Sequence, residues 1–336
     1  MPEISRLGIK MPESPIRKLA PLANEAKARG IKVYHLNIGQ PDIPTPEVGL
    51  EALRRIDQKV LSYCPSDGLP SLRQKMAEYY GRFAIEVTPD EIFITTGASE
   101  ALTLVFLACL DPGDEILIPE PAYANYMAFA ISAGATIRTI ATTIEEGFSL
   151  PKVEKFEELI NDRTRAIMIC NPNNPTGQFL SNAELERIVS KCEELKVYAI
   201  IDEAYADFIP REESAVMLGP KYNHMISVRT FSKGFGLAGA RAGYIITNKE
   251  LVKYIKKVSN PYMMNEMSRA ITAAILNYDV QPVEHGTDFT IIKGALRDAC
   301  GNKIIMAETD DRVPICLLRH IDEGVNLQKL LMKENI

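Results

Sequence analysis

The sequence lacks the excess of basic residues that binding to nucleic acid or to an acidic membrane surface requires. Its 336 residues include 38 Lys and Arg against 44 Asp and Glu, a formal net charge of −6. It also lacks an apolar run long enough to cross a bilayer, and its first residues contain no apolar core of a signal peptide. We therefore expect no nucleic acid and no membrane as partner, small metabolites as ligands, and a cytoplasmic location.

Paired metal-binding or disulfide motifs are missing too. There is no CxxC and no paired spacing of Cys and His, so neither a zinc site nor a disulfide framework is predicted. We expect no metal and free thiols at all six cysteines, which are Cys64, Cys109, Cys170, Cys192, Cys300 and Cys316. Internal repeats, low-complexity runs and flexible linkers are also absent from the sequence.

What the sequence does contain is an alternation of short apolar runs with amphipathic stretches, and 46% of its residues are hydrophobic. This pattern predicts an α/β fold in which helices cover a mostly parallel sheet. The expected strands are residues 91–96, 114–119, 165–170, 198–202, 225–230 and 242–247. Helices are expected to start near Ala98, Ala122, Asn182 and Asn248.

The two ends of the chain differ from this pattern. Near the start the sequence predicts a helix, with Ser14 as its N-cap, Pro15 in its first turn and Gly30 after its last turn. After Asn260 the sequence predicts a helix over about 264–277 and then a smaller α+β unit, which contains TDFTIIKG, VPICLLRH and a final helix NLQKLLMKEN. We expect a large domain over 45–260, and an N-terminal arm and small domain built from 1–44 and 261–336.

The segment GFGLAG, residues 234–239, satisfies the GxGxxG pattern of a dinucleotide-binding loop. That fingerprint needs a helix directly after the glycines and an acidic residue roughly 20 positions further on. Here Gly239 is followed by ARAGYII, which predicts a strand, and the residues from Tyr254 to Lys257 include no carboxylate. Two conditions of the fingerprint therefore fail, and a nucleotide-binding dehydrogenase is the least favoured alternative.

The lysine just before these glycines offers another interpretation. Lys233 follows a predicted strand, and an amine in such a place can form a Schiff base with a carbonyl cofactor. Thr230 and Ser232 supply hydroxyls, and Arg241 supplies a bidentate donor for phosphate oxygens. An exposed lysine in a glycine loop is the competing interpretation.

Seven segments, in order along the chain, resemble those of the class I/II aminotransferases, which are fold type I enzymes that use pyridoxal 5′-phosphate (PLP). The aspartate and histidinol-phosphate aminotransferase subgroups are both similar. The matching segments are NIGQPD (37–42), SYCPSDGLPSLR (62–73), TTGASEAL (95–102), PEPAYANY (119–126), NPNNPTG (171–177), IDEAYADF (201–208) and SKGFGLAGARAGY (232–244). The resemblance implies a large domain with a mostly parallel sheet in an αβα sandwich and a smaller, here reduced, α+β domain.

The resemblance also assigns roles at the reacting end of the cofactor. Lys233 would attach PLP and later move the proton of the substrate α-carbon, and Asp202 would hold the proton on the ring nitrogen. Tyr205 and Asn174 resemble the donors to the phenolic oxygen, and Tyr123 the aromatic residue that stacks on the ring. The competing interpretations are a turn or cap for Asp202, a simple turn for Asn174, and core packing for Tyr123.

Further residues resemble those that hold the phosphate and the substrate. The phosphate would be bound by backbone and side-chain groups of Gly97, Ala98, Ser99, Thr230, Ser232 and Arg241. Gly39, together with Asn174, would contact the substrate. Tyr63 looks like the tyrosine that reaches the phosphate of the neighbouring subunit, which implies a homodimer.

Near its end the sequence departs from the family pattern. Family members generally continue past a helix like NLQKLLMKEN into a strand with an arginine that binds the substrate carboxylate, and they have a longer segment in place of residues 275–287. We therefore expect a shortened C-terminal region, in which Arg312 and Arg319 have no assigned place. The expected activity is transfer of an amino group between an amino acid, or a related amine, and a 2-oxo acid. Another PLP reaction, such as decarboxylation or β-elimination, and a PLP-binding protein with little turnover are the alternatives.

Overall fold

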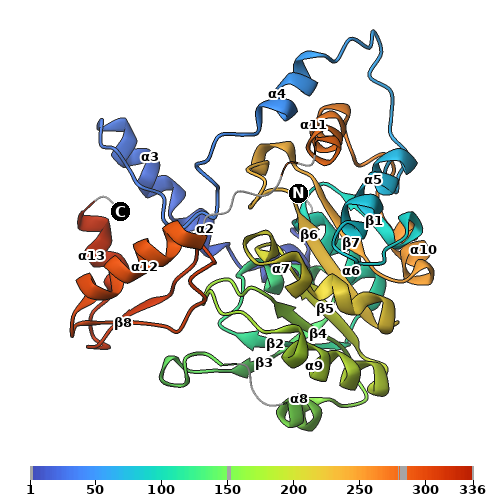
Figure 1. Cartoon of the computed structure of the whole chain (residues 1–336). Helices are drawn as coiled ribbons and strands as arrows, with labels where there is room; N and C mark the ends of the chain where they lie inside the picture. Colours follow the sequence, from blue (N-terminus) through green and yellow to red (C-terminus); the bar gives the residue numbers. More distant parts are fainter. Residues whose placement is uncertain (1–2, 150–152, 279, 281–285, 335–336) are drawn as a thin grey trace.

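The centre of the computed structural model is a seven-stranded sheet (Figure 1). The structure describes residues 3–149, 153–278, 280 and 286–334. The strand order is β1-β7-β6-β5-β4-β2-β3, in which β7 runs antiparallel to β1 and β6 and the other pairs are parallel. The strands are β1 (Ile92–Thr95), β2 (Glu115–Glu120), β3 (Thr136–Ala141), β4 (Thr164–Cys170), β5 (Tyr198–Asp202), β6 (Met225–Thr230) and β7 (Gly243–Ile246). The predicted α/β class with a mostly parallel sheet is confirmed.

Helices cover both faces of this sheet and form the ends of the chain. The α-helices are α1 (Arg6–Lys10), α2 (Pro15–Lys18), α3 (Ala20–Ala28), α4 (Glu47–Arg54), α5 (Pro70–Gly81), α6 (Ala98–Cys109), α7 (Asn125–Ser132), α8 (Val153–Leu159), α9 (Asn182–Leu195), α10 (Lys249–Val258), α11 (Glu266–Asn277), α12 (Gly286–Cys300) and α13 (Leu327–Lys333). Short 3₁₀ helices are η1 (Pro89–Glu91), η2 (Ile144–Glu146), η3 (Ala206–Phe208), η4 (Arg211–Glu213), η5 (Ala215–Lys221) and η6 (Ala238–Ala240).

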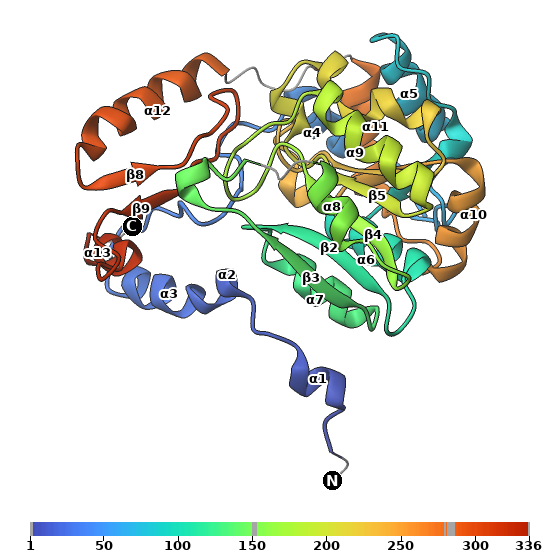
Figure 2. The same ribbon diagram turned by 90° about the horizontal axis from the view of Figure 1, so that it is seen from below.

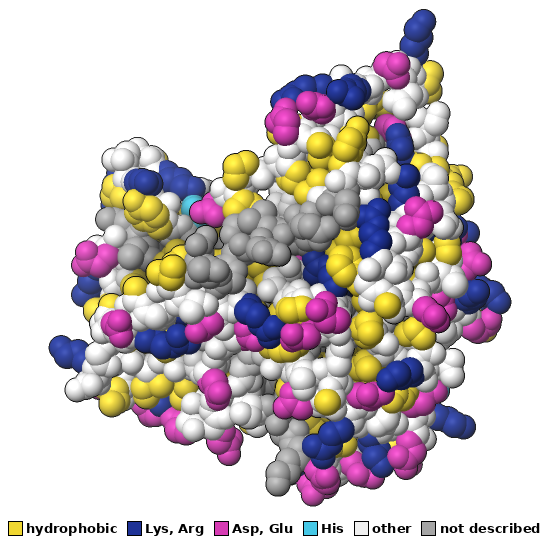
Figure 3. All heavy atoms as spheres, in the orientation of Figure 1, with side chains coloured by type: hydrophobic (Ala, Val, Ile, Leu, Met, Phe, Trp, Pro, Cys, Tyr) yellow, Lys and Arg dark blue, Asp and Glu magenta, His cyan; other side chains and the backbone are white. Residues whose placement is uncertain are grey.

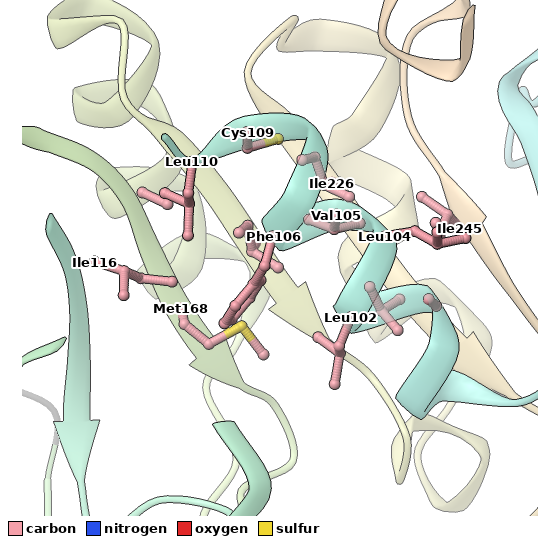
Figure 4. Close-up of a cluster of buried hydrophobic side chains, with 14 of the residues drawn as sticks. Leu102, Leu104, Val105, Phe106, Cys109, Leu110, Ile116, Met168, Ile226 and Ile245 are labelled. Carbon is pink, nitrogen blue, oxygen red and sulfur yellow. The ribbon is translucent and has the colours of Figure 1, made fainter. Parts of the chain in front are cut away.

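The alternation of side chains along each strand divides the core into two layers. On β5, Ile200 packs into the cluster beneath α6, α7 and α10, whereas Ile201 packs into the cluster beneath α8 and α9. Figure 4 shows the first layer, in which Leu102, Val105 and Phe106 of α6 lie among side chains of the strands. Half of the residues of α6 are buried, and they pack this helix closely on the sheet.

Most predicted elements have the predicted position, and the differences have local causes. Strands β5 and β6 have the predicted bounds, and α9 begins at Asn182 behind a capping box of Ser181 and Glu184. Strand β3 was not predicted, because this edge strand, TIRTIA, is largely exposed and carries polar residues. The predicted N-terminal helix is divided into α2 and α3, and TDFTIIKG lies in α12.

The small unit at the end of the chain is an antiparallel pair, β8 (Ile304–Met306) and β9 (Leu318–His320), with α12 and α13. It lies apart from the large sheet, with α3 beside α13 (Figures 1 and 2). Helix α11 follows the expected boundary at residue 260 but packs against α4 and α5. The proposed boundaries stay a prediction, and residues 279 and 281–285 of the segment expected to be short lie outside the described residues.

The described helices include none that is both long and apolar enough to cross a membrane. On the face in Figure 3, basic and acidic side chains are interspersed and do not form a patch of one sign. That distribution agrees with the modest net charge of −6.

Candidate active site

A cavity of about 280 Å³ opens where β4, β5 and β6 end, beside the N-terminus of α6. Parallel strands bring their carboxyl ends to one edge of a sheet, which is where α/β folds generally place their ligands. The lining combines this edge with the segment before α4. It consists of Ile38, Gly39, Gln40, Ala98, Ser99, Leu102, Tyr123, Cys170, Asn174, Asp202, Ala204, Tyr205, Thr230, Ser232, Lys233, Ala238 and Arg241.

Lys233 lies three residues after β6 with its amine directed into this cavity. The amine donates a hydrogen bond to the carbonyl oxygen of Gly39 and lies 5.5 Å from the centre of the Tyr205 ring. Burial lowers the pKa of Lys233; the positive charge of Arg241 lowers it further, while Asp202 opposes the shift. A lysine with a lowered pKa is more often uncharged, and the uncharged amine is the nucleophilic form.

The glycines after Lys233 do not begin a dinucleotide-binding helix. They are followed by the three-residue η6 and then by strand β7. Between the two, Arg241 adopts a left-handed conformation with φ 51°, which returns the chain toward the cavity. The order of the elements therefore argues against the dinucleotide interpretation, as the sequence does.

Asp202 is the last residue of β5, and its carboxylate is buried at the cavity wall. Its Oδ2 accepts a hydrogen bond of 2.7 Å from the hydroxyl of Tyr126, and its Oδ1 accepts one of 3.0 Å from the backbone N–H of Ala204. Burial raises the pKa of Asp202, and these two hydrogen bonds partly offset that rise. Asp202 therefore both stabilises the turn after β5, through its bond to Ala204, and lines the cavity.

Another group of lining residues is rich in donors for an anion. Thr230 Oγ1 and Ser232 Oγ are 2.9 Å apart, and Arg241 Nη1 lies 3.4 Å from Ser232 Oγ. Gly97 is the N-cap of α6, whose first turn has free backbone N–H groups. A Cβ on Gly97 would lie 2.5 Å from Nη2 of Arg241, so the guanidinium occupies the space that a side chain here would need.

Aromatic and amide groups complete the lining. Tyr123 accepts a hydrogen bond of 2.7 Å from Asn125 Nδ2, and its ring meets the Tyr126 ring edge to face at 5.4 Å. Burial raises the pKa values of Tyr123 and Tyr205, so both hydroxyls stay protonated and can donate. Asn174 lies in the loop after β4 and lines the same cavity.

Tyr63 does not line the cavity. Its side chain is 82% exposed and stacks on Tyr262, with ring centroids 4.6 Å apart. The late arginines are also elsewhere, because Arg312 is paired with Asp310 and Glu213, and Arg319 with Glu145 and Glu323. Neither arginine is among the described residues around the cavity.

The sequence analysis missed several residues of the site, among them Cys170, which lines the cavity, and Tyr126, which donates to Asp202 from outside the lining. Cys170 ends β4 and pairs in register with Asp202, so strand alternation could have placed it on the same face. Tyr126 follows Tyr123 by three positions, a spacing that puts both on one side of a helix. The other missed lining residues are Ile38, Gln40, Leu102, Ala204 and Ala238.

A buried ionic network lies directly behind the site. Arg229 contacts Asp207 at 2.8 Å and Glu203 at 3.5 Å, and Arg211 contacts Asp207 at 3.3 Å. Glu203 also accepts hydrogen bonds of 2.8 Å from Ser214 Oγ and the N–H of Ala215. Because Glu203 and Arg229 adjoin Asp202 and Thr230, the network ties together the ends of the two strands that carry the site.

Comparison with known proteins finds one family and its members. The family model for aminotransferase class I and II matches residues 31–291. The aspartate aminotransferase of Thermotoga maritima is 33% identical over 258 residues, covering 75% of this chain and 68% of that protein. The histidinol-phosphate aminotransferase of Caldanaerobacter subterraneus subsp. tengcongensis is 32% identical over 249 residues, covering 74% and 67%.

Solved structures give the same result for the fold. The aspartate aminotransferase from Thermus thermophilus with maleate superposes with a TM-score of 0.82 at 29% identity, covering 92% of this chain and 83% of that one. The aspartate aminotransferase from Thermotoga maritima gives 0.85 at 26% identity, covering 99% and 90%. The predicted fold type I architecture is thereby confirmed.

Proposed function

Because the chain belongs to the aminotransferase class I and II family, we propose that this cavity holds PLP and transfers an amino group between an amino acid, or a related primary amine, and a 2-oxo acid. The observation that carries the proposal is the meeting of three groups in one cavity. These are the amine of Lys233, the buried carboxylate of Asp202 and the guanidinium of Arg241.

The residues fit the chemical groups of PLP. The aldehyde requires an amine, the ring nitrogen an anion, and the phosphate a cluster of donors, which Lys233, Asp202 and Arg241 with the start of α6 supply. Since a Cβ on Gly97 would lie 2.5 Å from Nη2 of Arg241, glycine at this position leaves room for the guanidinium beside the start of α6. These features support the predicted cofactor roles, which remain proposals residue by residue.

When bound, PLP supplies an aldehyde that accepts an amine and a protonated ring that takes up the electrons left by loss of an α-proton. The residues of the chain prepare that chemistry. Asp202 would hold the proton on the ring nitrogen, because a buried carboxylate favours a cation beside it. Lys233, once free, would take the proton from the substrate α-carbon and return one to the cofactor's C4′.

The other lining residues would hold and orient the two molecules. Tyr205 and Asn174, which line the cavity, would donate to the phenolic oxygen, and Tyr123 would cover one face of the ring. Gly39 comes from the segment before α4 and already contacts the Lys233 amine, so its backbone is positioned beside the reacting atoms and the substrate.

A direct test is to add single amino acids to the PLP-loaded protein and follow both the cofactor absorbance and the 2-oxo acid released. Aspartate and histidinol phosphate are the first donors to try, because relatives are named for them. Equal amounts of the cofactor's amine form and oxo acid support transamination. Carbon dioxide or an eliminated group would favour decarboxylation or β-elimination, and no change with any donor would favour a binding protein with little turnover.

We also propose that the protein is a homodimer in which Tyr63 reaches the neighbouring cavity. The support is its 82% exposure and its stacking on the half-exposed Tyr262, which leaves the hydroxyl outside its own cavity. Tyr63→Ala and Lys233→Ala proteins, each impaired alone, should regain activity when mixed and allowed to exchange subunits. If Tyr63 serves its own subunit, mixing restores nothing. The predicted cytoplasmic location remains a proposal.

A further inference from the structure

We propose that Tyr126 is a positioning residue that keeps the Asp202 carboxylate ionised and oriented toward the ring nitrogen of the cofactor. This inference rests on the proposed function of the cavity. Its basis is the 2.7 Å hydrogen bond from the Tyr126 hydroxyl to Asp202 Oδ2. Tyr126 is 2% exposed and Asp202 is 4% exposed, so water does not compete effectively for this bond.

The two oxygens of Asp202 are held from different elements. Oδ1 is bound by the N–H of Ala204, which belongs to the turn after β5, whereas Oδ2 is bound by Tyr126 from α7. One bond alone would let the carboxylate rotate about the bonded oxygen. Two bonds from separate directions fix its plane, and each oxygen keeps a lone pair that can accept from the cavity.

The titratable groups around Asp202 leave Tyr126 as a neutral donor. Burial raises the pKa of Tyr126 well above its ordinary value and that of the Cys170 thiol to about 12, so neither adds a negative charge. Tyr205 is likewise kept protonated by burial, and Lys233 is attractive to the carboxylate when charged.

Glu203 is the remaining carboxylate beside Asp202, but it belongs to the network behind the sheet. It lies 3.5 Å from Arg229 and accepts from Ser214 and Ala215. Burial alone would favour the protonated form of Asp202, which cannot stabilise a ring cation. Hydrogen bonds to the carboxylate oppose that tendency. Among the described residues, Tyr126 is the side chain that donates such a bond.

Two tyrosines at the start of α7 thereby have different tasks, Tyr123 just before the helix and Tyr126 in its first turn. Tyr123 lines the cavity, while Tyr126 lies beneath it and packs edge to face on the Tyr123 ring at 5.4 Å. The carboxylate and the stacking surface are consequently positioned by one short segment, residues 123–126. An exchange of tyrosine for phenylalanine at 126 keeps this ring packing and removes the hydrogen bond.

The test is the pH dependence of PLP affinity, measured by titrating cofactor-free protein and comparing wild type with Tyr126→Phe. The variant should bind PLP about tenfold more weakly at the acidic end of the range, since a charge-assisted hydrogen bond is lost. The loss should shrink as pH rises and Asp202 ionises in both proteins. Tyr80→Phe is the matched control, because it removes an equally buried hydroxyl, 2.7 Å from Tyr244 Oη, outside the cavity.

A Tyr126→Phe profile that superposes on those of wild type and Tyr80→Phe overturns the inference. Wild type that binds no PLP at any pH refutes the proposed function instead, so the two failures are distinguishable. Should Tyr126→Phe not fold, 3-fluorotyrosine at position 126 provides a stronger donor of almost unchanged shape. It must strengthen PLP binding at acidic pH, and unchanged binding overturns the inference.

Discussion

Replacing Gly97 with alanine should weaken PLP binding at its phosphate end. The new Cβ would lie 2.5 Å from Nη2 and 3.1 Å from Cζ of Arg241, so the guanidinium must move. Position 97 also has φ 80° and ψ 170°, a backbone region that is essentially restricted to glycine. The substitution therefore disturbs both the arginine and the start of α6.

The size of the effect follows from these two contributions. Loss of one charge-assisted hydrogen bond to phosphate costs about 1.5–3 kcal/mol, which raises the Kd for PLP about 10- to 150-fold. The strained backbone lowers the free energy of unfolding by about 1–3 kcal/mol. The assays are a fluorescence titration of cofactor-free protein with PLP and urea unfolding of the same preparation.

Gly81→Ala is the matched control. Gly81 ends α5, and a Cβ there would meet no atom within 4 Å, so PLP affinity should not change. The unfolding free energy should stay the same or rise by up to about 1 kcal/mol, because alanine favours the helix. In an Arg241→Ala background, Gly97→Ala should have little further effect on Kd. A folded Gly97→Ala protein with the wild-type Kd would refute the reasoning.

Further predictions concern stability. Arg229→Met removes the buried cation that pairs with Glu203 and Asp207. It should lower the free energy of unfolding, measured by urea unfolding, by about 3–5 kcal/mol. Arg319→Met removes the surface ion pairs with Glu145 and Glu323 and should cost less than about 1 kcal/mol. A loss equal to that of Arg229→Met would contradict the account. Burial raises the pKa of Asp202, so the folded protein favours the protonated carboxyl. The stabilisation from this group is fully present below the unfolded pKa and is lost as pH rises through the folded pKa. Without PLP, Asp202→Asn should thus be more stable than wild type at pH 8, with no such gain at pH 3.5, and its transamination rate should fall about 100- to 1000-fold.

The sequence predicted best those parts of the fold that a single local signal determines. Strand β5 is an apolar run that ends in Asp202, and β6 is an apolar stretch with Ser227 inside it and a polar end. Both were predicted with the observed bounds. The edge strand β3 was missed because its pairing with β2 stabilises a segment that is polar by itself. Such an element depends on its neighbour, which local sequence does not reveal.

In the site, too, local sequence predicted some residues, whereas others depend on how the elements pack. Lys233, Asp202 and Arg241 have functional side chains at the ends of predicted strands, and the structure brings them to one cavity. Tyr126 was missed because a tyrosine in an apolar helix is ordinarily core, and its contact with Asp202 depends on how α7 crosses the sheet. The pairing of Glu203 with Arg229 likewise depends on β5 and β6 being neighbours in the sheet.

The central claim is that the amine of Lys233 is the covalent attachment point of PLP. Borohydride reduction of the PLP-loaded protein, followed by digestion and mass spectrometry, tests it directly because reduction makes the linkage permanent. The account predicts a phosphopyridoxyl group on the peptide that contains Lys233, and none there in Lys233→Ala. Labelling confined to another lysine, or no label in a protein saturated with PLP, would contradict it.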